Sequence, residues 1–286
     1  MFGKEYCMGE AKTERDVHYE KLFNGEKVPV IGLGTYTLGG GLSADHSRDR
    51  EHAQIIREAI ELGYRHIDTA QMYGGGHTEE LVGEAISSFD REDLFITTKV
   101  RSGDLAYKRV KQALDQSLKR LRTDYVDLYL IHWPNPAIPL ESTFQAFNEL
   151  VKEGKIRYTG VSNFSVSEMK RAQQLSDAPI TTNQVEYSVD SRAPDQNGVL
   201  DYCREHGILL TAYEPFGKGR LIGNSVLQKV ADKHGVSTAR VALAWLVRKP
   251  GVITIPMTSN EDHLRDNLAA SDFELSQVDL QLLEEL

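Results

Sequence analysis

The stretch His66-Ile-Asp-Thr-Ala-Gln-Met-Tyr-Gly-Gly-Gly76 determines how the rest of the chain is interpreted. It begins in a short apolar run that predicts a buried strand, and Asp68 stands at the end of that strand. Tyr73 follows in a glycine-rich loop. A carboxylate and a phenol placed near a core cost free energy unless they have partners. Lys99 and His132 close two later apolar runs, so these four residues form a candidate cluster.

Short runs rich in Val, Ile, Leu and Tyr alternate with amphipathic helical stretches from residue 30 onward. This alternation predicts an α/β fold, a (β/α)8 TIM barrel of parallel strands. The expected strands are residues 30–33, 64–67, 94–98, 126–131, 157–161, 180–185, 208–212 and 252–255. A doubly wound open sheet is the alternative. It requires a Gly-x-Gly-x-x-Gly turn that leads from a strand into a helix, and Gly32-Leu-Gly-Thr-Tyr-Thr does not match.

The beginning of the chain divides into two parts. Residues 1–20 lack apolar periodicity, and we interpret them as a polar N-terminal tail. Asn24-Gly25 lies between extended segments, a pattern typical of a β-hairpin. Residues 21–286 are expected to form a single catalytic domain, the barrel with its N-terminal hairpin.

Composition excludes several classes of protein. The formal net charge of -9 disfavours nucleic acid as a partner. No apolar run is long enough for a membrane span, and the first residues do not resemble a signal peptide. Cys7 and Cys203 are too few and too distant to indicate a disulfide framework or a metal site, so we expect no metal. We expect a monomer in a reducing cytoplasm.

Active sites of parallel barrels lie at the carboxyl ends of the strands. Nearly every expected strand ends in a hydrogen-bonding or charged side chain, which favours a functional rim over ordinary loops. These residues are Thr35, Asp68, Lys99, His132, Ser162 with Asn163, Gln184 with Glu186, Tyr213, and Met257 with Thr258.

The four residues of the cluster suit proton transfer to a carbonyl oxygen. A free tyrosine has a pKa of about 10, and a neighbouring ammonium lowers it. Lys99 beside Tyr73 therefore predicts a better acid, with Asp68 holding Lys99 charged. His132 is placed to orient or polarise the carbonyl. None of these groups carries hydride, so a cofactor is required.

Each of these residues also has a purely structural interpretation. Asp68 and Lys99 form a buried ion pair in many barrels, and a lone tyrosine such as Tyr73 is more often an amphipathic rim residue. A single histidine is more often part of the core, and Asn163 is also suited to capping a helix. The order and register of all of them together favour the functional interpretation.

At these motifs the chain resembles the aldo-keto reductase superfamily, of the prokaryotic type with a short C-terminus. The matching segments are residues 68–73, Lys99, and residues 131–134, 160–164, 183–187 and 212–217. The resemblance extends over roughly everything from Lys21 onward and implies a barrel that binds NADPH across the strand ends. It implies Asp68, Tyr73, Lys99 and His132 as the catalytic tetrad, with Tyr73 the general acid in reduction of aldehydes and ketones to alcohols.

The same resemblance implies the binding residues. Ser162, Asn163 and Gln184 are expected to hold the carboxamide, and Tyr213 to stack on the nicotinamide. The remaining cofactor-binding residues are expected to be Gly34, Thr35, Asp68, Pro215, Phe216, Gly217, Lys218, Met257, Thr258, Ser259, His263 and Asn267. Tyr36, Tyr73, His132 and Trp133 are expected to contact the carbonyl substrate.

The sequence departs from the family pattern at the expected 2′-phosphate site. Met257 stands where a lysine is usual, and His263 stands where many members have arginine, with Arg265 two positions later. We therefore expect NADP(H) as cofactor, with NAD(H) also accepted. Glu214 replaces a common serine, and a carboxylate there repels pyrophosphate unless it turns away or pairs with Lys218 or Arg220.

The chain ends soon after its last helical stretch, and the connection after His132 is short. An open pocket that accepts many aldehydes and activated ketones is the expectation. A rival interpretation is a regulatory module that binds the cofactor with little turnover. A glycosidase would need two carboxylates facing the sugar, and of Asp68 and Glu186 the first is expected to be neutralised by Lys99.

Overall fold

The computed structural model describes residues 18–286, and within them eight parallel strands follow one another in chain order around one sheet. They are β3 Leu33–Gly34, β4 His66–Asp68, β5 Phe95–Val100, β6 Val126–Ile131, β7 Ile156–Ser162, β8 Thr182–Glu186, β9 Leu209–Tyr213 and β10 Val252–Thr254. A parallel bridge joins Ile31, two residues before β3, to Thr254 of β10, and this bridge closes the barrel. The predicted TIM barrel is confirmed, and every predicted strand overlaps an observed one.

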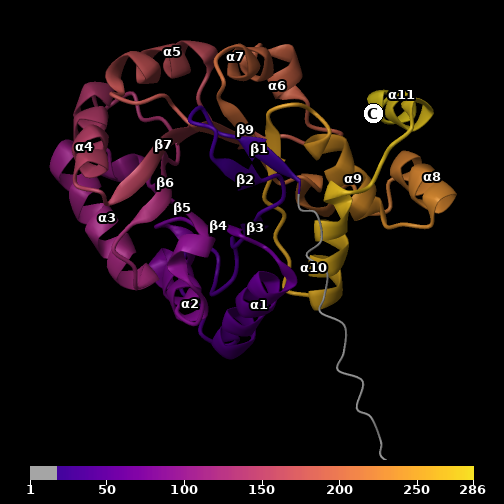
Figure 1. The fold of residues 1–286 in the computed structure, drawn as a ribbon, viewed down its shortest axis with the longest axis horizontal. Helices are drawn as coiled ribbons and strands as arrows, with labels where there is room; N and C mark the ends of the chain where they lie inside the picture. The colour runs from indigo at the N-terminus through magenta and orange to yellow at the C-terminus, as the bar shows by residue number, and fades with distance from the viewer. Residues whose placement is uncertain (1–17) are drawn as a thin grey trace, which may run out of the picture.

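Helices surround this sheet (Figure 1). The α-helices are α1 Asp49–Leu62, α2 His77–Ile86, α3 Tyr107–Leu121, α4 Leu140–Lys152, α5 Val166–Leu175, α6 Ala193–Gln196, α7 Val199–Glu205, α8 Ser225–His234, α9 Thr238–Val247, α10 Glu261–Leu268 and α11 Gln277–Glu284. The 3-10 turns are η1 Tyr73–Gly76, η2 Arg91–Asp93, η3 Ser102–Asp104, η4 Gly217–Gly219 and η5 Ala269–Ser271. Between residues 18 and 286, every helix is too short or too polar to span a bilayer.

The helix preceding β4 shows how local sequence positions the site. α1 buries Ile56, Ala59 and Ile60, and their spacing places them on one face of the helix. Gly63 ends the helix with φ at 112°, a conformation that glycine adopts without steric cost. Its N–H donates to the carbonyls of Ala59 and Ile60, and the chain then turns directly into the strand that ends at Asp68.

The predicted N-terminal hairpin is also confirmed. β1 Tyr19–Lys21 pairs antiparallel with β2 Lys27–Pro29, and Gly25 in the turn has φ at 85°. The Asn24 amide donates to the Tyr158 hydroxyl at 2.7 Å, near the start of β7, so the hairpin covers the amino-terminal end of the barrel. Tyr19 and Glu20 belong to β1, whereas residues 1–17 of the predicted polar tail lie outside the described residues.

Candidate active site

A cavity of about 810 Å³ lies at the carboxyl-terminal ends of the strands, where the sequence predicts the site. Its volume is within the range of about 300–1,000 Å³ usual for small-molecule and cofactor sites. The predicted residues that line it are Gly34, Thr35, Tyr36, Asp68, Tyr73, His132, Trp133, Ser162, Asn163, Gln184, Tyr213, Pro215, Phe216, Lys218 and Met257. The structure therefore brings together most of the residues that the sequence singles out.

The buried ammonium of Lys99 connects the acidic and phenolic members of the cluster. Its Nζ lies 2.5 Å from Oδ1 of Asp68 and 3.4 Å from the hydroxyl of Tyr73. The Thr69 carbonyl accepts a third hydrogen bond at 2.8 Å. Since Lys99 is fully buried, these three oxygens replace its hydration. Asp68 ends β4, and Lys99 is the last residue but one of the neighbouring strand β5, so the parallel pairing of these strands keeps the two residues close.

Burial and charge act in opposite directions on Tyr73 and Lys99. Burial raises the pKa of Tyr73, the Lys99 ammonium lowers it, and the net pKa is raised. The expected lowering by Lys99 is present, but burial is the larger effect. Burial lowers the pKa of Lys99, but Asp68 and Tyr73 outweigh it and the net pKa is raised. Lys99 is therefore a cation, and Tyr73 keeps its proton at neutral pH.

His132 is a neutral imidazole in this site. Burial, reinforced by the Lys99 ammonium, lowers the pKa of His132 to about 3. Its ring packs edge-on against that of Tyr73, with centroids 5.7 Å apart. Among the described residues, its Nδ1 has no hydrogen-bond partner. The imidazole faces the cavity as an uncharged polar group.

Side chains from β7, β8 and β9 build the opposite wall. Asn163 has φ at 62°, and its amide donates to the Ser162 hydroxyl at 3.0 Å and to the His132 carbonyl at 3.2 Å. The Tyr213 hydroxyl donates to the Asn163 Oδ1 at 2.9 Å. The Gln184 amide donates to Asp68 Oδ2 at 2.8 Å across the barrel, which fixes the second oxygen of that carboxylate.

The loop after β9 resolves the question raised by Glu214. Its carboxylate lies 3.5 Å from Nζ of Lys218, whereas Arg220 pairs with Asp190 at 3.3 Å. Lys218 lines the cavity and is largely exposed, and Gly217 is buried beside it with φ at 55°. The Glu214 oxygen in this ion pair, Oε2, is buried and has no hydrogen-bond partner among residues 18–286.

The residues expected near the adenosine phosphate lie beyond the cavity lining, except for Met257. Oγ1 of Thr258, shortly before α10, lies 3.5 Å from Nδ1 of His263 in the first turn of that helix. Ser259 lies between Thr258 and the N-cap residue Asn260. Asn267 is buried on the same helix. Arg265 pairs with Glu261 of its own helix.

Comparisons with known proteins agree with this geometry. The model of the aldo/keto reductase family matches residues 30–286. The chain belongs to this family. It is 40% identical over 268 residues to a glyoxal reductase of Bacillus subtilis (strain 168), covering 93% of this chain and 91% of that protein. It is 36% identical over 269 residues to a methylglyoxal reductase of Escherichia coli (strain K12), covering 92% of each.

Solved aldo-keto reductases share the fold. A thermostable member crystallised with the inhibitor epalrestat has a TM-score of 0.91 and 46% identity, covering 94% of this chain and 99% of that one. A Klebsiella pneumoniae member solved with NADP and acetate has a TM-score of 0.86 and 35% identity, covering 93% and 94%. This chain is thus an oxidoreductase of the aldo-keto reductase family.

Several residues of this aldo-keto reductase line the cavity without having been predicted. Leu42 and Met72 come from loops, Gly219 follows Lys218, and Ile255 follows β10. Their apolar or small side chains carry no chemical signal in the sequence. For Ile255, the position directly after the last strand was a usable indication, because strand ends form the rim.

The neutral state of His132 makes stability depend on pH. Its pKa is about 6.5 in the unfolded chain and about 3 when folded, so only the unfolded state takes up a proton between pH 7 and pH 5. This group therefore lowers the free energy of unfolding by about 2 kcal/mol over that interval. We expect His132→Gln to remove this loss, which urea denaturation of both proteins at pH 7 and pH 5 measures. Equal pH dependence in the two proteins contradicts the prediction.

Proposed function

We propose that this chain reduces aldehydes and ketones to alcohols with NADP(H), and that Tyr73 is the general acid. The position of Lys99 supports this assignment most directly. Its ammonium contacts both the Asp68 carboxylate and the Tyr73 hydroxyl, beneath a cavity lined by Tyr73 and His132. A phenol beside a charged ammonium is suited to give up its proton when negative charge develops on a nearby oxygen.

Each of four side chains has a separate role in the proposed proton transfer. Bound NADPH would supply hydride for the carbonyl carbon. The residue that donates a proton to the carbonyl oxygen is Tyr73, through its hydroxyl. Lys99 stabilises the resulting phenolate, and Asp68 keeps Lys99 charged and in place. His132 polarises the same oxygen as a neutral donor, which avoids a second buried cation next to Lys99.

The cavity suits a dinucleotide with its nicotinamide end near Tyr73. Ser162, Asn163 and Gln184 offer amide and hydroxyl groups to a carboxamide, and Tyr213 offers an aromatic ring. The other proposed contacts are Gly34, Thr35, Asp68, Pro215, Phe216, Gly217, Lys218, Met257, Thr258, Ser259, His263 and Asn267. The Klebsiella pneumoniae relative solved with NADP supports NADP(H) as the cofactor.

The same geometry supports acceptance of NAD(H) as well. Met257 brings no charge to the expected 2′-phosphate site, and Arg265 is already paired with Glu261. Glu261 and Asp262 also occupy the first turn of α10, where a helix otherwise favours an added anion. We propose that the specificity constants for NADPH and NADH differ by less than a thousandfold.

The names of similar proteins support a proposal for the substrate class of this chain. Reductases of glyoxal and methylglyoxal are similar to this chain over more than nine tenths of its length. Tyr36 and Trp133, both about half exposed, line the cavity and leave room for small compounds to enter. We propose small α-dicarbonyl compounds and other activated carbonyls as substrates.

Replacing Tyr73 tests the proton donor. We expect Tyr73→Phe to lower kcat for methylglyoxal by about 10²–10⁴-fold, the usual contribution of a general acid, while NADPH still binds. Oxidation of NADPH at 340 nm and NADPH fluorescence titration measure the two quantities. Tyr36→Phe is the matched control, since its ring lies 5.1 Å from that of Tyr73. Similar losses in both variants contradict the assignment, and binding without turnover in the wild type favours the regulatory module.

Restoring a cation at the expected phosphate site tests cofactor choice. Charge-assisted hydrogen bonds contribute about 1.5–3 kcal/mol, so Met257→Lys is expected to raise the kcat/KM ratio of NADPH to NADH by about 10- to 100-fold. Met257→Gln adds polarity without charge and is expected to leave the ratio nearly unchanged. If the kcat/KM ratio of NADPH to NADH is the same in Met257→Lys as in the wild type, the 2′-phosphate does not bind near residue 257.

We also propose that the enzyme is a monomer in the cytoplasm. Its large exposed apolar side chains, such as Phe23, Leu42, Ile222 and Val278, are distributed over separate segments. The Cys203 thiol is free, which is consistent with the reducing cytoplasm, and burial raises its pKa to about 12. Sedimentation equilibrium is expected to give the 32.1 kDa mass of one chain, and twice that mass contradicts the proposal.

A further inference from the structure

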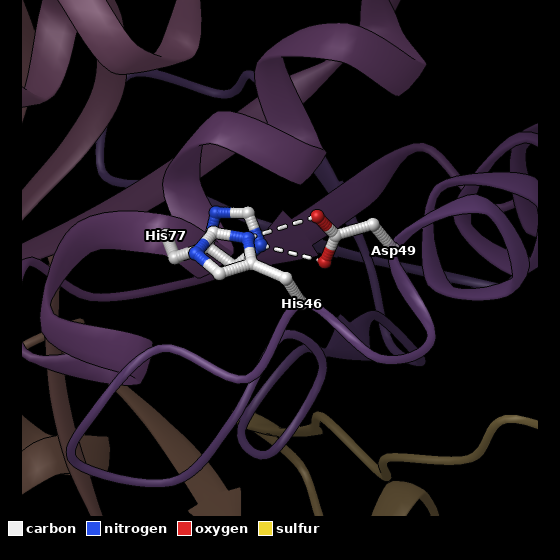
Figure 2. A group of neighbouring side chains, drawn as sticks. All are labelled: His46, Asp49 and His77. Carbon is white, nitrogen blue, oxygen red and sulfur yellow. Dashed lines mark hydrogen bonds and ion pairs between the residues drawn. The ribbon is translucent and has the colours of Figure 1, made fainter.

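Two imidazoles and a carboxylate meet on the outside of the barrel, where α1 and α2 begin (Figure 2). Asp49 Oδ1 lies 2.7 Å from Nε2 of His77, and its Oδ2 lies 3.0 Å from Nδ1 of His46. The two rings are 4.0 Å apart between centroids. One donor atom from each residue lies within 4.8 Å of the others. Three side chains that commonly ligate metals thus converge on one point.

A fourth residue orients this set. The second nitrogen of His77, Nδ1, lies 2.9 Å from a carboxylate oxygen of Glu80. Metal-binding histidines usually donate their other ring N–H to a carboxylate in this way, which fixes the tautomer and the ring plane. His77 is only 8% exposed, so its position is well constrained, whereas His46 is 66% exposed and open to solvent.

We propose that His46, Asp49 and His77 bind a divalent transition-metal ion, with Zn²⁺ the best match. Imidazole nitrogen and carboxylate oxygen are suitable zinc ligands, with bond lengths of about 2.0–2.2 Å. Asp49 and Glu80 supply two negative charges to balance the ion. The exposed His46 side chain is free to make the small inward shift that metal bonds require, and water completes the coordination.

The site links two segments that shape the active-site cavity. His46 lies in the loop that carries Tyr36 and Leu42, both of which line that cavity. His77 begins α2 immediately after η1, the turn that starts at Tyr73. The Gly74 N–H already donates to the Gly41 carbonyl at 2.7 Å. A bound ion therefore strengthens the attachment of this loop to the segment that holds Tyr73, without touching the reacting groups.

Zinc titration of the chelator-treated full chain tests the proposal. Calorimetry is expected to show one Zn²⁺ bound per wild-type chain, with affinity at least tenfold weaker in His46→Ala. Glu80→Gln is expected to weaken binding by about 10- to 100-fold, as for other residues that orient a metal ligand. His18→Ala is the matched control, because His18 is also an exposed histidine paired with one carboxylate, Asp272. It is expected to bind Zn²⁺ like the wild type.

Hydrogen exchange gives a second measurement, independent of catalysis. Zn²⁺ is expected to slow the hydrogen exchange of backbone amides in residues 36–48 of the wild type. In His46→Ala, Zn²⁺ is expected to leave the exchange rates of the same amides unchanged. Since His46 is exposed, this variant is expected to keep the far-ultraviolet circular dichroism of the wild type. Absence of stoichiometric binding by the wild type overturns the proposal. So does equal affinity in wild type and His46→Ala, which locates the ion elsewhere.

Discussion

The site depends on one buried ion pair, between Lys99 and Asp68. An ammonium taken wholly out of water is stable only when several oxygens replace its hydration. The Asp68 carboxylate, the Thr69 carbonyl and the Tyr73 hydroxyl supply those oxygens. This requirement holds Tyr73 in place, so the interaction that stabilises the charge also positions the residue that we propose as proton donor. Removal of either charged partner leaves the other uncompensated in the core.

The barrel makes this arrangement rigid. Asp68 and Lys99 lie on adjacent parallel strands, and Gln184 reaches Asp68 from the other side of the barrel. Asn163, in a left-handed conformation after β7, ties Tyr213 to the backbone of His132. Hydrogen bonds between strand ends therefore connect the walls of the cavity. Loops contribute Tyr36, Leu42 and Trp133 at its mouth, where variation costs the core little.

Electrostatics in this cavity differ from a simple sum over neighbouring charges. Lys99 favours the phenolate of Tyr73, yet burial has the larger effect and the phenol stays protonated. The same burial keeps His132 neutral. A protonated phenol and an uncharged imidazole thus face the cavity above one fixed cation. Two hydrogen-bond donors are thereby available near that cation without a second positive charge.

The sequence by itself determined the barrel and the main members of the site. Alternating strand and helix patterns define the fold, and in a parallel barrel each strand must end at the same rim, so Asp68, Lys99 and His132 were identifiable from their positions. Depth of burial was not, because it depends on how distant segments pack. Tertiary structure alone decided the raised pKa of Tyr73, the pairing of Glu214 with Lys218, and the meeting of His46 with His77. Each depends on distances between segments that no local pattern records.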